Sequence, residues 1–192
     1  MTLSLHFPPN LVFTEDALFR FCQANRDVRI ERDERGNLLV SPLLGLEANF
    51  SLANLGAELH SWNRSARIGK VSGSDGGYML PDASMRAPCV AWVSHERLAT
   101  VSPDDLKRFA HVCPDFVIEL LSENDTLGEL QEKMEQYLKN GVRLGWLIDP
   151  KSWQTHVYRL EREPEILPFE KALSSEDVLP GFELNVARTL EN

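Results

Sequence analysis

The sequence contains little cysteine. Only Cys22, Cys89 and Cys113 occur among its 192 residues. An odd number of cysteines without regular spacing argues against a disulfide framework and against a four-ligand zinc site. The five histidines are also scattered, without the short spacing that zinc ligands show. We therefore expect the chain to work in a reducing compartment, the cytoplasm.

Long apolar runs are absent as well. No stretch approaches the roughly 18 consecutive apolar residues that a membrane helix needs. Residues 1–9 lack the basic segment and following apolar run of a signal peptide. We expect no association with a membrane.

Basic residues are outnumbered, since 20 Lys and Arg stand against 29 Asp and Glu and give a net charge of −9. Residues 161–192 hold eight acids and three bases, so they carry −5 of that charge. This surplus of acid argues against a protein that coats nucleic acid through its overall field. A local basic groove remains compatible with it.

What is present suffices for one folded domain. A hydrophobic content of 43% excludes a disordered acidic chain, and 192 residues can bury a sizeable core. We expect a single domain over residues 1–192. Its core would span about residues 14–160, followed by an acidic appendage over residues 161–192.

Local patterns predict the elements of the first half. Thr14, followed by two acids, marks the start of a helix that runs to about residue 25. A turn-forming tetrad separates two β-prone runs, residues 28–32 and 37–41, and predicts a hairpin. The further predicted elements are a helix over residues 47–64, strands over residues 78–80 and 89–93 separated by a turn at Pro81 and Asp82, and a short helix from Ser102.

Residues 115–121 predict a central strand. They are apolar on both alternating faces except at Asp115 and Glu119, as expected of a strand covered on both sides. The predicted elements that follow are a helix from a capping box at Thr126 to about Asn140, a strand over residues 144–148 and a returning strand over residues 153–158. We therefore expect an α/β fold, a mixed sheet with flanking helices and an N-terminal β hairpin.

Glu119 is the most informative residue, because a carboxylate in an apolar central strand needs a partner or a metal. An ordinary salt bridge to an arginine is one explanation. A functional pairing with Lys133 is another, since Lys133 lies at the edge of the apolar stripe of the following helix. The competing placement of Lys133 is an exposed ion pair with Glu129, one turn earlier.

Four segments carry a resemblance to a known family. They are residues 80–94 (LPDASMRAPCVAWVS), 114–125 (PDFVIELLSEND), 133–137 and 141–150 (GVRLGWLIDP). Together they resemble the Uma-type restriction-endonuclease-like family, a branch of the PD-(D/E)XK nuclease superfamily, from about residue 14 to residue 186. The resemblance implies a mixed sheet flanked by helices, a divalent metal (Mg²⁺ or Mn²⁺) and hydrolysis of phosphodiester bonds in DNA. Because such nucleases cut two strands, it also implies a homodimer.

The resemblance assigns roles to particular residues. Glu119 matches the metal-binding acid of the (D/E)XK strand. The usual lysine position, two residues later, is Leu121, and Lys133 matches a lysine that the family supplies from the next helix. Glu47 matches the family's first acid, which would contact the metal through water or help to deprotonate it. Lys133 would orient the nucleophile or stabilise developing charge.

Cys89 departs from the family pattern, which has an aspartate after the proline at this position. Mg²⁺ prefers oxygen ligands in a near-octahedral shell, whereas a thiol is softer and mostly protonated at neutral pH. Asp115 is no substitute, because four residues of strand put it about 13 Å from Glu119. A loop acid, Asp75 or Asp82, could take the missing place.

Further residues are candidates for DNA contact or for thiol chemistry. The candidates for contact with the DNA backbone are Arg29, Arg32, Arg35, Arg64, Arg67 and Lys70, diluted by neighbouring acids. Cys89 with His95, or Cys113 with His111, could form a thiol enzyme, but a strand cysteine is usually a small buried hydrophobe.

Two interpretations of function follow. The first is a Mg²⁺-dependent DNA endonuclease whose site is impaired because Cys89 replaces the metal-binding aspartate. The alternative is a catalytically inactive nuclease-like domain that binds DNA or another protein. Glu47, Glu119 and Lys133 favour the first, whereas Cys89 and the net charge of −9 favour the second.

Overall fold

The computed structural model of the chain describes residues 2–7 and 13–191. Its main sheet has six strands in the order β11-β10-β9-β8-β7-β4. These are β4 (Gly69–Ser72), β7 (Val90–Ser94), β8 (Phe116–Leu120), β9 (Leu144–Asp149), β10 (Gln154–Arg159) and β11 (Glu165–Pro168). Only β8 and β9 pair in parallel, in a register that places Glu119 opposite Leu147. The predicted mixed sheet is confirmed.

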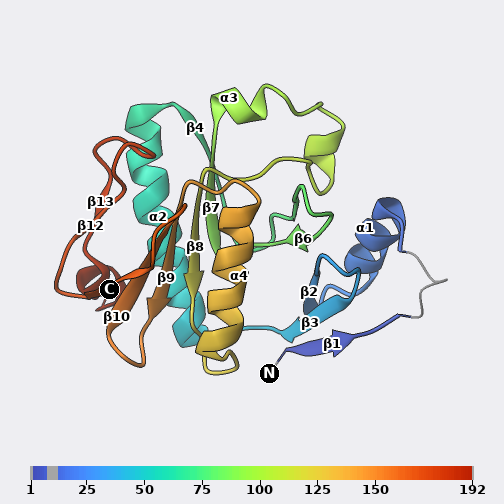
Figure 1. Cartoon of the computed structure of the whole chain (residues 1–192), viewed down its shortest axis with the longest axis horizontal. Coiled ribbons are helices and arrows are strands. Elements are labelled where there is room, and N and C mark those ends of the chain that lie inside the picture. The colour runs from blue at the N-terminus through green and yellow to red at the C-terminus, as the bar shows by residue number, and fades with distance from the viewer. Residues whose placement is uncertain (1, 8–12, 192) are drawn as a thin grey trace.

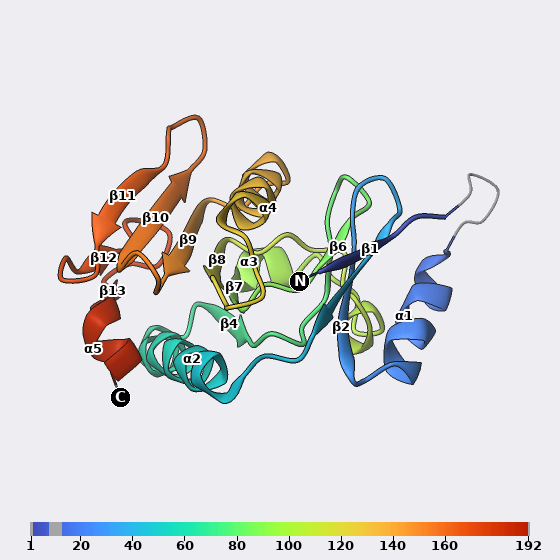
Figure 2. The ribbon, with the colours of Figure 1, turned by 90° about the horizontal axis from the view of Figure 1, so that it is seen from below.

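One helix covers each face of this sheet. Figure 2 shows α2 (Leu46–Ala66) on one side and α4 (Leu127–Lys139) on the other. Ile118 of β8 joins the core on the α2 side, and Val117 joins the core on the α4 side. Strand β8 is therefore covered on both faces, which explains its nearly continuous apolar sequence.

A smaller sheet forms beside the main one, in the order β1-β3-β2-β6-β5. Its strands are β1 (Leu3–Leu5), β2 (Val28–Arg32), β3 (Leu38–Pro42), β5 (Tyr78–Met79) and β6 (Met85–Arg86). Strands β2 and β3 are the predicted hairpin, with Arg32 opposite Leu38. Helix α1 (Glu15–Ala24) packs on this sheet through Leu18, and Thr14 caps it by accepting a hydrogen bond from the Ala17 amide at 3.2 Å.

The turn after β5 corrects one expectation. Strand β5 pairs with β6, so the turn at Pro81 and Asp82 does not join it to the strand that follows Cys89. Asp82 stabilises the turn itself, because its Oδ1 accepts hydrogen bonds from the amide and hydroxyl of Ser84 at 2.9 and 2.6 Å. This local turn ends β5 and starts a separate strand, which the apolar pattern alone does not indicate.

The segment between β7 and β8 also differs from expectation. Helix α3 (His95–Leu98) was not predicted, although Ser94 caps it by accepting from the Arg97 amide at 3.3 Å. The helix expected from Ser102 is a short 3₁₀ turn over Asp105–Lys107. Helix α3 has only four residues, which is too short to show the apolar period of a helix.

Residues beyond 160 add to the main sheet and its core. Strand β11 extends the sheet at its edge, and the remaining elements are β12 (Leu173–Ser174), β13 (Glu183–Leu184) and α5 (Val186–Glu191). Phe182 stacks on Trp146 of β9, with ring centroids 5.9 Å apart. This acidic segment is therefore anchored by buried apolar side chains. Of the described helices, none is long and apolar enough to cross a membrane.

Candidate nuclease-like centre

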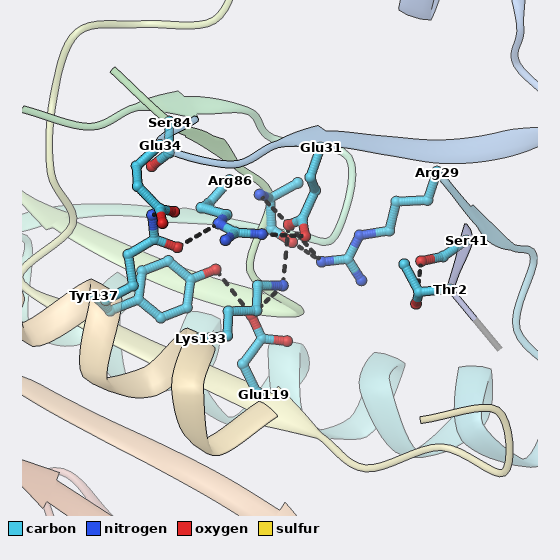
Figure 3. Close-up of polar contacts among 12 residues, drawn as sticks. Thr2, Arg29, Glu31, Glu34, Ser41, Ser84, Arg86, Glu119, Lys133 and Tyr137 are labelled. Atoms are coloured by element: carbon cyan, nitrogen blue, oxygen red, sulfur yellow. Dashed lines mark hydrogen bonds and ion pairs between the residues drawn. The ribbon is translucent and has the colours of Figure 1, made fainter. Parts of the chain in front are cut away.

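The centre lies where β8 ends beneath helix α4. Glu119 is the penultimate residue of β8 and its side chain is 1% exposed. Alternation along the strand sends the side chains of Ile118 and Leu120 toward α2. Glu119 consequently faces α4 (Figure 3).

Lys133 reaches Glu119 from α4, as the edge of the apolar stripe predicts. Its Nζ lies 2.8 Å from Oε1 of Glu119, and its side chain is 9% exposed. The competing partner, Glu129, instead accepts a hydrogen bond from the Thr126 hydroxyl at 2.7 Å as part of the capping box. The structure therefore places Lys133 inside, with Glu119, and not on a solvated face.

Tyr137, one turn after Lys133, completes the contacts of Oε1. Its hydroxyl donates to Glu119 at 2.9 Å. Burial and the charge of Glu119 raise the pKa of Tyr137 well above its ordinary value, so this hydroxyl stays protonated and remains a donor.

Cys89 meets the other oxygen of Glu119. Its Sγ donates to Oε2 at 3.3 Å from the residue directly before β7. Burial, with the nearby charge of Glu119, raises the pKa of the thiol to about 12. Cys89 is therefore a neutral hydrogen-bond donor beside Glu119, where an aspartate would be an anion.

A second buried carboxylate, Glu31 of β2, was missed by the sequence reasoning. Its Oε1 lies 3.0 Å from Nζ of Lys133 and accepts from the Ala87 amide at 2.7 Å. Burial alone would raise its pKa, but the charges of Lys133, Arg29 and Arg86 outweigh it and lower the pKa to about 2. The available signal was the alternation of β2, which places Arg29 and Glu31 on one face.

Two arginines, Arg86 and Arg29, flank Glu31 on opposite sides (Figure 3). Nη2 of Arg29 lies 3.2 Å from Oε1 of Glu31, and Nη1 of Arg86 lies 3.5 Å from Oε2. Gln136 of α4 accepts from Nε of Arg86 at 2.7 Å. The chain of contacts thus links the hairpin, the β6 strand and α4 around one buried ion cluster.

Within the described part of the chain, neither loop acid considered as a substitute ligand forms a hydrogen bond or ion pair with Glu119. Asp82 accepts hydrogen bonds from Gln136 and Asn140, both at 2.8 Å, in addition to those from Ser84. These bonds outweigh its desolvation and lower its pKa to about 2. Asp75 is exposed at the mouth of the pocket. Both line the pocket, and neither has a contact with Glu119 among the described residues.

The structure does not bring Glu47 to the other predicted site residues, which are Cys89, Glu119 and Lys133. It is exposed in the first turn of α2 and lines a different hollow, with Phe50 and Trp153. Ala48, the next residue, packs against the core, and adjacent residues of a helix point about 100° apart. Glu47 therefore faces solvent.

The predicted basic residues divide into two groups. Arg29 lines the pocket, and Arg32 is buried with its guanidinium donating to the carbonyls of Ala83 and Phe13. The remaining four are exposed, and of these Arg35 also lines the pocket: Arg35, Arg64, Arg67 and Lys70.

The structure separates the residues of the thiol-enzyme alternatives. Cys89 and His95 lie at opposite ends of β7, six residues or roughly 20 Å apart along the strand. Cys113 donates to the carbonyl of Pro114, whereas His111 contacts Glu15 of α1. Neither pair forms a nucleophile and base in contact.

A pocket of about 940 Å³ opens over this centre. We call the part of the pocket that is lined by Cys89 and the ion cluster its floor; its residues are Arg29, Glu31, Arg86, Cys89, Glu119 and Lys133. Among the described residues that line it, ten are Asp or Glu and five are Lys or Arg. The ion cluster thus lines an otherwise acidic cavity.

The side chains around Glu119 do not form a binding site that fits a divalent cation. Both oxygens of Glu119 already accept hydrogen bonds, from Lys133 and Tyr137 on one side and from Cys89 on the other. Three cations surround the two glutamates, and the thiol adds no negative charge. Within the described part of the chain, no three His, Cys, Asp or Glu side chains are grouped to hold a metal. A Mg²⁺ ion needs several oxygen ligands.

The comparisons with known proteins agree with this fold. The family model Uma2, described as "Putative restriction endonuclease", matches residues 15–187. A solved structure described as "a putative nuclease belonging to DUF820", from Anabaena variabilis ATCC 29413, has a TM-score of 0.72 and 18% sequence identity. That match covers 84% of this chain and 89% of the other. A search of curated proteins found no match.

The family match over residues 15–187 includes the whole main sheet and all the residues of the ion cluster. The restriction-endonuclease-like proteins generally use a divalent metal. By the extent of that match, the chain belongs to the Uma2 family of restriction-endonuclease-like proteins.

Proposed function

We propose that this chain is a DNA endonuclease of the Uma2 family whose native centre is impaired by Cys89. The observation that carries the proposal is the position of Lys133 between Glu119 and Glu31, at 2.8 and 3.0 Å, on the floor of an open pocket. An ordinary structural ion pair needs one carboxylate and no access from solvent. The family relationship supports DNA as the substrate.

The remaining residues have distinct roles in this proposal. Lys133 supplies the positive charge that would stabilise the anionic transition state of phosphodiester hydrolysis. Tyr137 fixes the orientation of Glu119 by donating to its Oε1. Glu31 holds Lys133 from the other side. Cys89 is neutral at the position where the family resemblance implies a negatively charged, metal-binding aspartate.

The second candidate function is a DNA-binding module without hydrolysis. The contacts of Glu119 favour it, because each oxygen of that carboxylate already accepts a hydrogen bond and Lys133 places a positive charge beside it. Both candidates predict that Cys89→Asp gains cleavage activity, since this substitution places a carboxylate beside Glu119.

The deciding experiment is cleavage of plasmid DNA with Mg²⁺ or Mn²⁺ by the native chain, Cys89→Asp and Cys89→Ser. We expect Cys89→Asp to cleave at least about 100-fold faster than the native chain, as removal of one group that stabilises transition-state charge costs that much. Cys89→Ser controls for loss of the thiol alone and should not gain activity. Glu119→Ala in the Cys89→Asp background should abolish cleavage.

The two candidates differ in the residual activity of the native chain. Slow cleavage that disappears in Glu119→Ala supports the impaired enzyme, and no cleavage above that variant supports the binding module. Failure of Cys89→Asp to cleave would contradict both the site and the proposed function. Because a duplex has two strands, we also propose that the cleaving form is a homodimer, which sedimentation of the Cys89→Asp variant on DNA would test.

A further inference from the structure

Arg29 is the most open of the three cations around Glu31. Its side chain is 25% exposed, whereas those of Arg86 and Lys133 are each 9% exposed. Its Nη2 donates to Glu31 and to the carbonyl of Ala87. Among the described residues, no hydrogen bond is made by its Nε or Nη1, and in Figure 3 Nη1 points away from Glu31. Donors of Arg29 are therefore available to a ligand in the pocket.

The charge at the floor of the pocket favours an anion. Arg29, Arg86 and Lys133 carry three positive charges, against two negative charges on Glu31 and Glu119. Cys89 adds none because its thiol is protonated. An aspartate at that position would cancel the excess, so the excess positive charge is a consequence of the cysteine.

We propose that the native centre binds one phosphate group of DNA without a metal, and that Arg29 is the residue that contacts it. This inference rests on the proposed function, because it takes DNA as the ligand. A guanidinium presents paired donors that match phosphate oxygens. The side chain of Arg29 is already held at one end by Glu31 and Ala87, so less of its conformational freedom is lost when it binds.

The surroundings restrict binding to a single phosphate. Exposed acids of the hairpin and of α4, such as Glu34, Glu132 and Glu135, line the same pocket. A DNA backbone laid across several phosphates would meet these carboxylates, whereas one phosphate inserted at the floor meets Arg29. The dependence of affinity on salt should therefore correspond to about one neutralised phosphate.

The test is fluorescence anisotropy of a labelled duplex in EDTA, with the native chain, Arg29→Gln and Arg26→Gln. Arg26 is an exposed arginine outside the pocket and removes the same charge. We expect Arg29→Gln to bind at least about tenfold more weakly and Arg26→Gln to bind within about twofold of the native chain. A plot of log affinity against log salt concentration should have a slope of about −1, not the −6 or steeper of a protein that contacts many phosphates.

Inorganic phosphate distinguishes a general phosphate site from one that takes DNA. It should displace the duplex from the native chain in competition, because both present the same oxygens. Binding of inorganic phosphate without any binding of the duplex would overturn the assignment to DNA. Binding of the duplex only after addition of Mn²⁺ would overturn the metal-free site.

A measurement on the native chain tests the inference even if Arg29→Gln does not fold. Phenylglyoxal modifies accessible arginines, and mass spectrometry locates the product. The duplex should protect Arg29 and leave Arg26 reactive. Equal modification of Arg29 with and without DNA, or equal affinities of folded Arg29→Gln and the native chain, would refute the inference. The proposed function would stand in that case if Cys89→Asp cleaves DNA, and it would fail on its own if Cys89→Asp does not.

Discussion

Sγ of Cys89 lies 3.3 Å from Oε2 of Glu119 and donates a hydrogen bond to it. The contact joins the residue before β7 to the adjacent strand β8, at the floor of the open pocket. A carboxylate at position 89 would repel Glu119 and attract a cation, whereas the thiol satisfies Glu119 without one. For this reason we expect the native centre to bind a divalent cation more weakly than a centre with an aspartate at position 89.

Cys89 should be unreactive in the folded chain. Its pKa of about 12 leaves almost no thiolate at pH 8, and its side chain is buried. We expect iodoacetamide to label Cys89 only in denaturant, as measured by mass spectrometry of peptides. Rapid labelling of folded protein would show a thiolate in the pocket and contradict the neutral donor described here.

Glu31 should stabilise the fold in a pH-dependent way. Its pKa falls from an ordinary value of 4.5 to about 2 in the folded chain, so its stabilisation is complete above pH 4.5 and is lost as the pH falls toward 2. The shift corresponds to about 3 kcal/mol. Chemical denaturation of the native chain and Glu31→Gln should show a difference of about this size at pH 7 that shrinks toward pH 2. A difference independent of pH would contradict the assignment.

Lys133 and Glu119 should be energetically coupled. Both are buried and in contact at 2.8 Å, so removal of Lys133 leaves the buried Glu119 without its cation, and removal of Glu119 leaves Lys133 with Glu31 alone. A double-mutant cycle with Lys133→Met and Glu119→Gln should give an interaction energy of about 1–3 kcal/mol in the free energy of unfolding. Additive effects of the two substitutions would show that the contact contributes nothing to stability.

Glu47 provides the contrasting case. Since it is exposed and lines another hollow, Glu47→Ala should change the free energy of unfolding by no more than about 0.5 kcal/mol. In the Cys89→Asp background it should leave the rate of plasmid cleavage unchanged. A loss of cleavage comparable to that of Glu119→Ala would place Glu47 in the site, as the family resemblance implies.

Sequence reasoning located the parts of the centre that depend on strong local patterns. The apolar run of β8 isolates Glu119, and the stripe of α4 gives the direction of Lys133. These two signals predict their contact without knowledge of the tertiary fold. Periodicity and capping also predict α1, α2 and α4 and the hairpin of β2 and β3, but not the short elements β6 and α3.

Glu31 could not be found in this way. It lies in a short hairpin strand among other charged residues, and its burial depends on the hairpin packing beside α4, about 100 residues later in the chain. The alternation of β2 places Glu31 and Arg29 on one face, but it does not indicate that this face packs beside α4. For the same reason, the pattern of α2 does not place Glu47 relative to Glu119, because it indicates the apolar face of the helix but not the distance of its first turn from β8.

The most direct test of the account is calorimetric titration of Mn²⁺ into the native chain, Cys89→Asp and Cys89→Ser. The central claim is that the native centre lacks a ligand because residue 89 is a neutral thiol. We expect Cys89→Asp to bind Mn²⁺ at least about tenfold more tightly than the native chain, and Cys89→Ser to show no gain. Equal affinity of the native chain and Cys89→Asp for Mn²⁺ would contradict the claim.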